Sequence, residues 1–169
     1  MINNPSDPKE AYSHAVDILS RQDRSEKELL EKLTKKGFEE SAAAEAIKKL
    51  KEKHYIDDVR MASHFISAHL SSQSLTQLKF KLMRKGIGSD DIAAAIDEVC
   101  DEAVDESDSI LNRQATAVFD FLKKKKFDKE DPSRDKILAS LARKGFSYDA
   151  IREGISMLEA EQSEEELTE

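Results

Sequence analysis

The side chains in this sequence that are best suited to chemistry are three pairs of basic residues, and their chemistry is the binding of negative charge. Each pair stands directly before a glycine: Lys35-Lys36 before Gly37, Arg84-Lys85 before Gly86, and Arg143-Lys144 before Gly145. Lysine and arginine attract phosphate groups and acidic polymers. Cations in the last turn of a helix also offset the negative end of the helix dipole, by about 0.3 to 1 kcal/mol each. The pairs therefore have two interpretations, a binding surface or helix electrostatics.

Helix geometry favours a binding surface for the first residue of each pair. At 100° per residue, the position two before the glycine lies 200° from the apolar position four before it. Lys35, Arg84 and Arg143 are therefore expected to point away from the core. Further lysines extend this row, although a run of charges is also typical of a solvated helix face. The predicted contact residues for a nucleic acid or an acidic partner are Lys35, Lys36, Lys79, Lys81, Arg84, Lys85, Lys123, Lys124, Lys125, Lys126, Arg143 and Lys144.

The sequence shows no arrangement typical of catalysis or metal binding. The nearest two histidines, His64 and His69, are five residues apart and lie on different faces of a helix. Asp57 and Asp58 are adjacent and are expected to begin a helix rather than to act as an acid and base pair. No glycine-rich phosphate loop or nucleophile elbow occurs. We expect no enzyme activity, metal or cofactor, and we expect the single cysteine, Cys100, to be a small buried side chain.

The basic pairs belong to an internal repeat. In each copy a serine is followed by eleven residues and then the glycine, without gaps: Ser25 to Gly37, Ser74 to Gly86, and Ser133 to Gly145. Each serine is a candidate helix N-cap; Glu28 and Gln77 complete a capping box in the first two copies, and Lys136 leaves the third incomplete. Each glycine is expected to end its helix in the left-handed conformation, because it has no Cβ to clash.

Apolar residues on both sides of each glycine recur at intervals of three and four, so each copy contains two amphipathic helices. The residues predicted to be buried are Leu29, Leu33, Ala43, Ile47 and Leu50 in the first copy, Leu78, Leu82, Ile92, Ile96 and Val99 in the second, and Ile137, Leu141, Ile151, Ile155 and Leu158 in the third. Ala46, Ala95 and Gly154 are small enough for a neighbouring helix to approach closely.

A further apolar helix precedes each serine, at 10–21, 58–70 and 109–124, which makes three helices per repeat. The sequence therefore predicts an all-α fold, an elongated and curved array of three tandem three-helix modules. The predicted divisions are a flexible N-terminus at 1–9, modules at 10–53, 54–103 and 104–158, and an acidic tail at 159–169 that is frayed or disordered. Ten inserted residues before the third glycine predict a longer first helix in the third module and a loop at 127–132.

The net charge of -8 is concentrated in two blocks. Residues 97–110 contain seven acidic and no basic side chains, and residues 159–169 contain six acidic ones. The modules themselves are therefore neutral to basic. No apolar run has membrane-spanning length and no signal peptide is visible, so we expect a monomeric, cytoplasmic protein without a membrane contact.

Three motifs stand out along the chain. They are Ser-Glu-Lys-Glu-Leu at 25–29, Tyr-Ile-Asp-Asp-Val-Arg-Met-Ala at 55–62 followed by Phe65-Ile66, and Leu-Ala-Arg-Lys-Gly-Phe-Ser-Tyr-Asp-Ala-Ile at 141–151. Together they resemble the RecX family, regulators of the RecA recombinase. The resemblance covers about residues 10 to 158. It implies three three-helix modules that lie in the helical groove of a RecA filament, and a non-enzymatic inhibitor of ATP hydrolysis, filament extension, strand exchange and co-protease activity. The implied partners are the RecA nucleoprotein filament and single-stranded DNA through or beside RecA.

The sequence also departs from this family. Members often carry more arginines where this chain has residues 63–64 and 67–73, and the block at 97–108 is acidic. Both differences weaken the expectation of DNA binding by this chain alone. Two alternatives stay open: an independent nucleic-acid-binding helical repeat that does not act on RecA, whose binding would weaken steeply with salt, and a helical scaffold for another charged partner.

Overall fold

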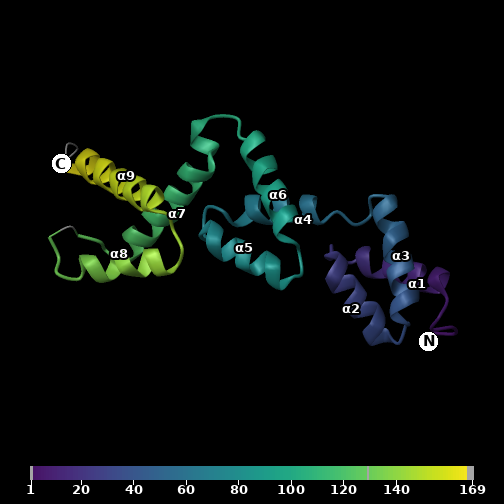
Figure 1. The fold of residues 1–169 in the computed structure, drawn as a ribbon. Helices are drawn as coiled ribbons and strands as arrows, with labels where there is room; N and C mark the ends of the chain where they lie inside the picture. The colour runs from purple at the N-terminus through teal and green to yellow at the C-terminus, as the bar shows by residue number, and fades with distance from the viewer. Residues whose placement is uncertain (1, 129, 167–169) are drawn as a thin grey trace. The chain divides into compact units, whose positions relative to one another are not determined.

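The computed structural model describes residues 2–128 and 130–166. Within these residues the chain is helical and contains no strand, which confirms the predicted all-α class (Figure 1). The helices are α1 (Pro8–Leu19), α2 (Glu26–Lys36), α3 (Glu40–Glu52), α4 (Asp58–His69), α5 (Leu75–Arg84), α6 (Ser89–Asp101), the 3-10 helix η1 (Glu106–Asp108), α7 (Ile110–Lys124), α8 (Arg134–Arg143) and α9 (Tyr148–Glu166). α7 has 15 residues where α1 and α4 have 12 each, as expected for the insertion before the third glycine.

The three repeat glycines end their helices as predicted. Gly37, Gly86 and Gly145 have positive φ angles of 109°, 86° and 85°. In each copy the next, buried apolar residue donates its amide to the carbonyl five residues earlier, from Phe38 to Leu33, from Ile87 to Leu82 and from Phe146 to Leu141. This pattern is the Schellman motif, in which the left-handed residue lets the chain turn back and satisfy the last carbonyls of the helix.

The repeat serines begin their helices in two of the three copies. Ser25 forms the predicted capping box with Glu28, and the Oγ of Ser74 accepts the amide of Gln77 at 3.2 Å. Ser133 makes no capping bond through its side chain with any described residue, so the prediction of a third serine cap is wrong. Its backbone is already in the helical region (φ -80°, ψ -8°), and its amide donates to Asp131 at 2.6 Å.

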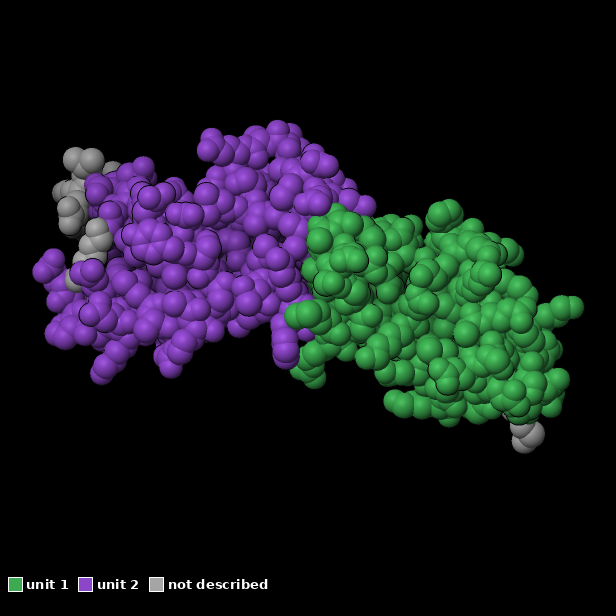
Figure 2. Space-filling model, in the orientation of Figure 1, with its two compact units in different colours: residues 1–64, 82–95 green, residues 65–81, 96–169 purple. Residues whose placement is uncertain are grey.

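The chain divides into two compact units (Figure 2). Unit 1 comprises residues 1–64 and 82–95, and unit 2 comprises residues 65–81 and 96–169. The predicted first and third modules each fall within one unit, whereas the predicted second module is shared between both. The division into three modules stays a prediction.

Small residues bring α1 and α3 together in unit 1. Ala11 and Ala15 of α1 share a buried cluster with Ala43 and Ala46 of α3, and the leucines of α2 close it. The segment before α1, predicted to be flexible, contacts the first turn of α1, and its flexibility stays a prediction. The amides of residues 3 and 4 donate to the Glu10 carboxylate at 2.8 and 2.9 Å, which lowers the pKa of Glu10.

In unit 2, α7 packs mainly on α9 (Figure 1). Gly154 makes this packing possible, because a Cβ there would lie 2.6 Å from Val118 Cγ1 and 2.8 Å from the carbonyl oxygen of Ala115. Most residues predicted to be core are buried, including every predicted leucine. The exceptions are half-buried: Ile96, Ile137, Ile151 and Ile155.

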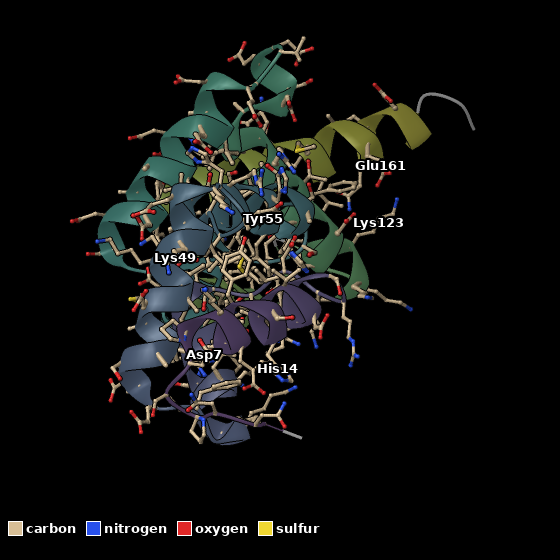
Figure 3. The ribbon with its side chains drawn as sticks, turned by 90° about the vertical axis from the view of Figure 1, so that its right-hand side faces the viewer. Asp7, His14, Lys49, Tyr55, Lys123 and Glu161 are labelled. Atoms are coloured by element: carbon tan, nitrogen blue, oxygen red, sulfur yellow. The ribbon has the colours of Figure 1, made fainter. Side chains whose placement is uncertain are left out.

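Two further expectations are corrected by the structure. Cys100 is exposed rather than buried, because it follows the buried Val99 and is turned about 100° from it around α6. The acidic tail continues α9 as far as Glu166 instead of fraying at residue 159, and Lys123 of α7 pairs with Glu161 across a 2.6 Å contact (Figure 3). Residues 167–169 of the predicted tail lie outside the described residues.

None of the described helices is long and apolar enough to cross a membrane.

Candidate interaction surfaces

The first residue of each basic pair is exposed, as helix geometry predicted. Lys35, Arg84 and Arg143 occupy the last turns of α2, α5 and α8. Lys35 and Arg84 form no ion pair within the described residues. The Nε of Arg143 donates to the carbonyl of Ala139 at 3.3 Å, so part of that guanidinium is used within its own helix. The repeat therefore presents one outward cation at the same position in each copy.

The second residue of each pair is more often structural than exposed. Lys36 is exposed, with its Nζ 3.5 Å from Nδ1 of His14. Lys85 and Lys144 are half-buried, so neither side chain is fully open to a partner, and their assignment as contact residues stays a prediction. The Nζ of Lys85 lies 3.2 Å from Glu28 Oε1, and the Nζ of Lys144 lies 3.9 Å from the centre of the Phe121 ring. Both lysines are half-buried because the backbone of each lies at a contact between two repeats.

The first of these contacts joins the start of α2 to the end of α5 and the start of α4; we call it the first junction. Ser25 is fully buried, and its Oγ donates to the carbonyl oxygen of Lys85 at 2.5 Å. The amide of Glu26, the first residue of α2, donates to Asp58 Oδ1 at 3.1 Å. A carboxylate from α4 thus caps α2, where the exposed amides favour negative charge.

Several charged side chains meet at the first junction and affect the pKa of Asp58. Burial raises the pKa of Asp58, and repulsion from Glu26 and Asp91 adds to the rise, while the Glu26 amide and Lys51 oppose it. Lys51 Nζ also lies 2.5 Å from Glu26 Oε2. The junction therefore contains a half-buried carboxylate whose proton the folded protein holds more tightly than an unfolded chain would.

The second junction repeats this arrangement between the start of α5 and the end of α8. Ser74 is fully buried, and its Oγ donates to the carbonyl oxygen of Lys144. The amide of Leu75, the first residue of α5, donates to Gln114 Oε1 of α7 at 2.8 Å. Gln114 is 6% exposed, and its Nε2 donates to the carbonyls of residues 70 and 73 at 2.7 and 2.8 Å. A neutral amide takes the place that Asp58 occupies in the first junction.

The repeat glycines also serve the junctions. A Cβ on Gly86 would lie 2.5 Å from the Cβ of Lys27, and one on Gly145 would lie 2.6 Å from the Cβ of Thr76. Lys27 and Thr76 both stand two residues after the repeat serine. Sequence reasoning assigned the serines and glycines to helix ends alone and missed this second use. The constant spacing between serine and glycine could have indicated this second use, because a helix end by itself does not require a fixed spacing.

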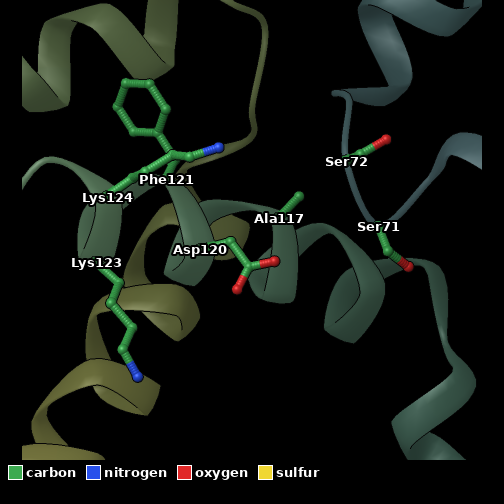
Figure 4. Close-up of a pocket in the computed structure, with 7 residues that line it drawn as sticks. All are labelled: Ser71, Ser72, Ala117, Asp120, Phe121, Lys123 and Lys124. Atoms are coloured by element: carbon green, nitrogen blue, oxygen red, sulfur yellow. The ribbon is translucent and has the colours of Figure 1, made fainter.

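A groove in unit 2 is lined by two of the predicted basic residues, Lys123 and Lys124, and by the aromatic residue Phe121 (Figure 4). It has a volume of about 520 Å³, with residues 71 and 72 on one side and α7 on the other. Lys123, Lys124, Asp120 and Phe121 line it, and the ring of Phe121 also carries the ammonium group of Lys144. Lysines beside a partly exposed ring suit an anionic, flat group such as a nucleotide.

The remaining predicted cations differ in the partners that their side chains contact. Lys79 and Lys81 are exposed on α5, and Lys81 donates to the side chain of Gln73. Lys123 is engaged with Glu161. Lys125 and Lys126 end α7, where Lys126 takes a left-handed φ of 49° in the place usually given to glycine. Part of the run at 123–126 is therefore a helix end as well as a charged surface.

The two aspartates at the start of α4 have structural roles, and the described residues contain no group of three or more His, Cys, Asp or Glu side chains that could hold a metal ion. Asp57 and Asp58 begin α4, as expected, and have separate tasks. Asp57 Oδ1 accepts the amide of Arg60 at 2.9 Å, whereas Asp58 caps α2.

These features define the class of protein as a helical repeat whose copies are joined through serine, glycine and a helix-capping acceptor, with cations on the outer helix ends. The profile described as "RecX, first three-helix domain" matches residues 11–55. The chain is similar to the regulatory protein RecX of Clostridium perfringens (strain 13 / Type A), with 36% identity over 126 residues, 75% of this chain and 58% of the relative. It is similar to that of Bacillus pumilus (strain SAFR-032), with 33% identity over 165 residues, 94% of this chain and 60% of the relative.

A solved structure of RecX from Lactobacillus salivarius matches with a TM-score of 0.71 and 26% identity, over 90% of this chain and 97% of that one. The chain belongs to the RecX family of regulatory proteins. It spans about three-fifths of the length of the curated relatives that it matches.

Proposed function

We propose that this protein is a negative regulator of RecA, which binds RecA filaments on single-stranded DNA in the filament groove and inhibits ATP hydrolysis, filament extension, strand exchange and co-protease activity. Membership of the RecX family carries the proposal. Equivalent exposed cations at Lys35, Arg84 and Arg143 support it, since repeated contacts suit a repeating partner. Once one contact forms, the next forms at a high effective concentration, so a filament is favoured over free RecA subunits.

Titration of the protein into RecA that hydrolyses ATP on single-stranded DNA tests the proposal. We expect hydrolysis to fall as the protein is added, both to forming and to pre-formed filaments. Unchanged hydrolysis at a large molar excess would reject the proposal.

Charge reversal separates binding from folding. R84E and R143E should weaken inhibition with little change in the melting temperature, because both side chains are exposed. Lys85 and Lys144 are left unchanged in this test, because they take part in the junctions. The contrasting variants L82A and L141A remove fully buried side chains and should each cost about 2 to 5 kcal/mol of stability. Their loss of inhibition would follow from unfolding.

The groove of Figure 4 favours one alternative, an independent nucleic-acid-binding module that does not act on RecA. This alternative predicts tight binding of oligothymidylate without RecA. Its affinity should fall with salt at a slope of about -0.7 per phosphate neutralised. Weak binding of the oligonucleotide by a protein that inhibits RecA would exclude it.

A further inference from the structure

A pocket in unit 1 contains none of the predicted contact residues and uses the Tyr-Ile-Asp-Asp motif instead. It has a volume of about 160 Å³ and lies between the end of α1, the segment before α2 and the start of α4. Its apolar lining comes from Leu19, Ile56 and Met61. Its polar lining comes from Asp23, Arg24, Tyr55, Asp57, Arg60 and His64.

We propose that this pocket binds one glutamate side chain from an acidic segment of a protein partner, with Arg24 donating two hydrogen bonds to its carboxylate. The inference rests on the proposed function in one respect, since it assigns that segment to the protein component of the RecA filament. The chemistry of the pocket itself can be tested without RecA.

The side chain of Arg24 has one donor without an acceptor among the described residues. Its Nε is buried and has no hydrogen-bond acceptor among the described residues. Its Nη2 donates to Gln22 Oε1 at 2.5 Å, and its Nη1 is 4.0 Å from Glu28 Oε1. Nε and Nη2 form the edge of a guanidinium that binds a carboxylate through two parallel hydrogen bonds. Gln22 is exposed and its Oε1 accepts from Nη2, so a carboxylate that takes the place of this side chain gives Nη2 and Nε an acceptor each.

The other walls match the rest of a glutamate side chain. The apolar lining suits its methylene groups, because removing apolar surface from water is favourable. Arg60 and His64 stand one turn apart on α4 and are exposed at the rim, where Arg60 adds positive charge. Asp57 is already engaged with the Arg60 amide at the start of α4, so its charge is partly compensated. Tyr55, which is 58% exposed (Figure 3), extends the rim for contact with a neighbouring residue of the segment.

A nucleotide fits these walls less well. The cavity is smaller than the roughly 300 to 1,000 Å³ typical of small-molecule sites. The apolar lining would remove water from the oxygens of a phosphate without replacing their hydrogen bonds. A single carboxylate on an apolar stem therefore agrees better with the lining than a phosphodiester does.

A titration followed by NMR tests the pocket directly. N-acetylglutamate N-methylamide should shift the backbone amide resonances of residues 24 and 55–64 in a saturable way at millimolar concentration. The glutamine analogue, which lacks the charge, should shift these resonances much less. R24K should abolish the response, because lysine cannot donate two parallel hydrogen bonds to one carboxylate. Absence of a saturable shift, an equal response to the glutamine analogue, or stronger shifts with inorganic phosphate or oligothymidylate would overturn the proposal.

Filament binding tests the assignment of the partner. R24K should weaken association with RecA filaments about tenfold, the effect of losing a hydrogen bond to a charged group. R21K is the matched control, since Arg21 is exposed in the same segment and does not line the pocket; its affinity should stay within about twofold. Equal binding by wild type and R24K would end the inference and leave the proposed function standing. A wild-type protein that does not bind filaments would remove both the proposed function and this partner, while the glutamate titration would still decide whether the pocket grips a carboxylate.

Discussion

The two junctions repeat one backbone contact with different side-chain chemistry. In both, a buried serine donates to a carbonyl at the end of a helix from the next repeat, and the first amide of the serine's own helix finds an acceptor on a third helix. The acceptor is the half-buried carboxylate of Asp58 in one and the buried amide of Gln114 in the other. The comparison shows that serine and glycine determine the contact, whereas the acceptor determines its response to pH and salt.

Glycine substitutions test the part that the junctions share and should have the largest effect. G86A and G145A place a Cβ at positive φ and within 2.6 Å of a neighbouring Cβ, so we expect a loss of about 2 to 4 kcal/mol in the free energy of unfolding. G37A is the control, because its Cβ would meet only Ile2 at 3.8 Å among the described residues. It should lose about 1 to 2 kcal/mol, the cost of positive φ alone. Equal losses in urea unfolding of all three variants would contradict the close approach at the junctions.

Removing the acceptors tests the difference between the junctions. Q114A leaves the Leu75 amide and two carbonyls without their partner in a buried site, so we expect a loss of about 2 to 3 kcal/mol. D58A removes one capping bond at a half-buried site and should lose about 1 kcal/mol. Both values come from chemical unfolding at neutral pH. A larger loss from D58A than from Q114A would mean that the charged junction contributes more to stability than its hydrogen bonds indicate.

Serine variants test the repeated hydrogen bond. S25A and S74A each lose a helix cap and the bond to the next repeat, and each should cost about 1 kcal/mol. S133A is the matched control in the third copy, since that serine does not cap; it should stay within about 0.5 kcal/mol of the wild type. Thermal melting of the three variants under one buffer condition measures the pattern. A loss from S133A as large as the other two would show that the third copy uses its serine as well.

The pH dependence of the first junction should be the smallest effect. Because the folded protein holds the Asp58 proton more tightly, Asp58 contributes stability that is complete below the pKa of an unfolded aspartate, about 3.9. This contribution is lost as the pH rises through the raised folded-state pKa. D58N keeps an oxygen that can accept the Glu26 amide but cannot titrate. Its stability should therefore fall less than that of the wild type over this pH window, as followed by unfolding at a series of pH values; parallel curves would contradict the raised pKa.

Much of the helical structure could be predicted because its causes are local. Leu29, Leu78 and Leu141 are buried as expected, since the period of apolar residues reports which side of a helix faces the core. Gly37, Gly86 and Gly145 end helices because few other residues tolerate positive φ. The outward direction of Lys35, Arg84 and Arg143 follows from helix geometry and the same apolar pattern.

The features that the sequence did not predict involve residues whose surroundings come from distant parts of the chain. Lys85 and Lys144 are half-buried because a serine of the preceding repeat reaches their carbonyls, sixty and seventy residues away along the chain. The acidic stretch after residue 158 remains helical to Glu166, and Lys123 of α7 pairs with one of its glutamates. The pocket around Arg24 combines residues from α1, α4 and the segment before α2, so no single motif predicts it.

The sequence by itself determined the helices, the helix ends at the repeat glycines, the repeat and the outward direction of the first basic residue in each pair, because these depend on contacts within a few residues of chain. The tertiary structure decided which of the basic residues remain open, which acceptor caps each helix across a junction, and where the Nε of Arg24 is buried without an acceptor among the described residues. Those outcomes depend on hydrogen bonds and steric contacts between distant segments, and a linear pattern does not state which segments meet.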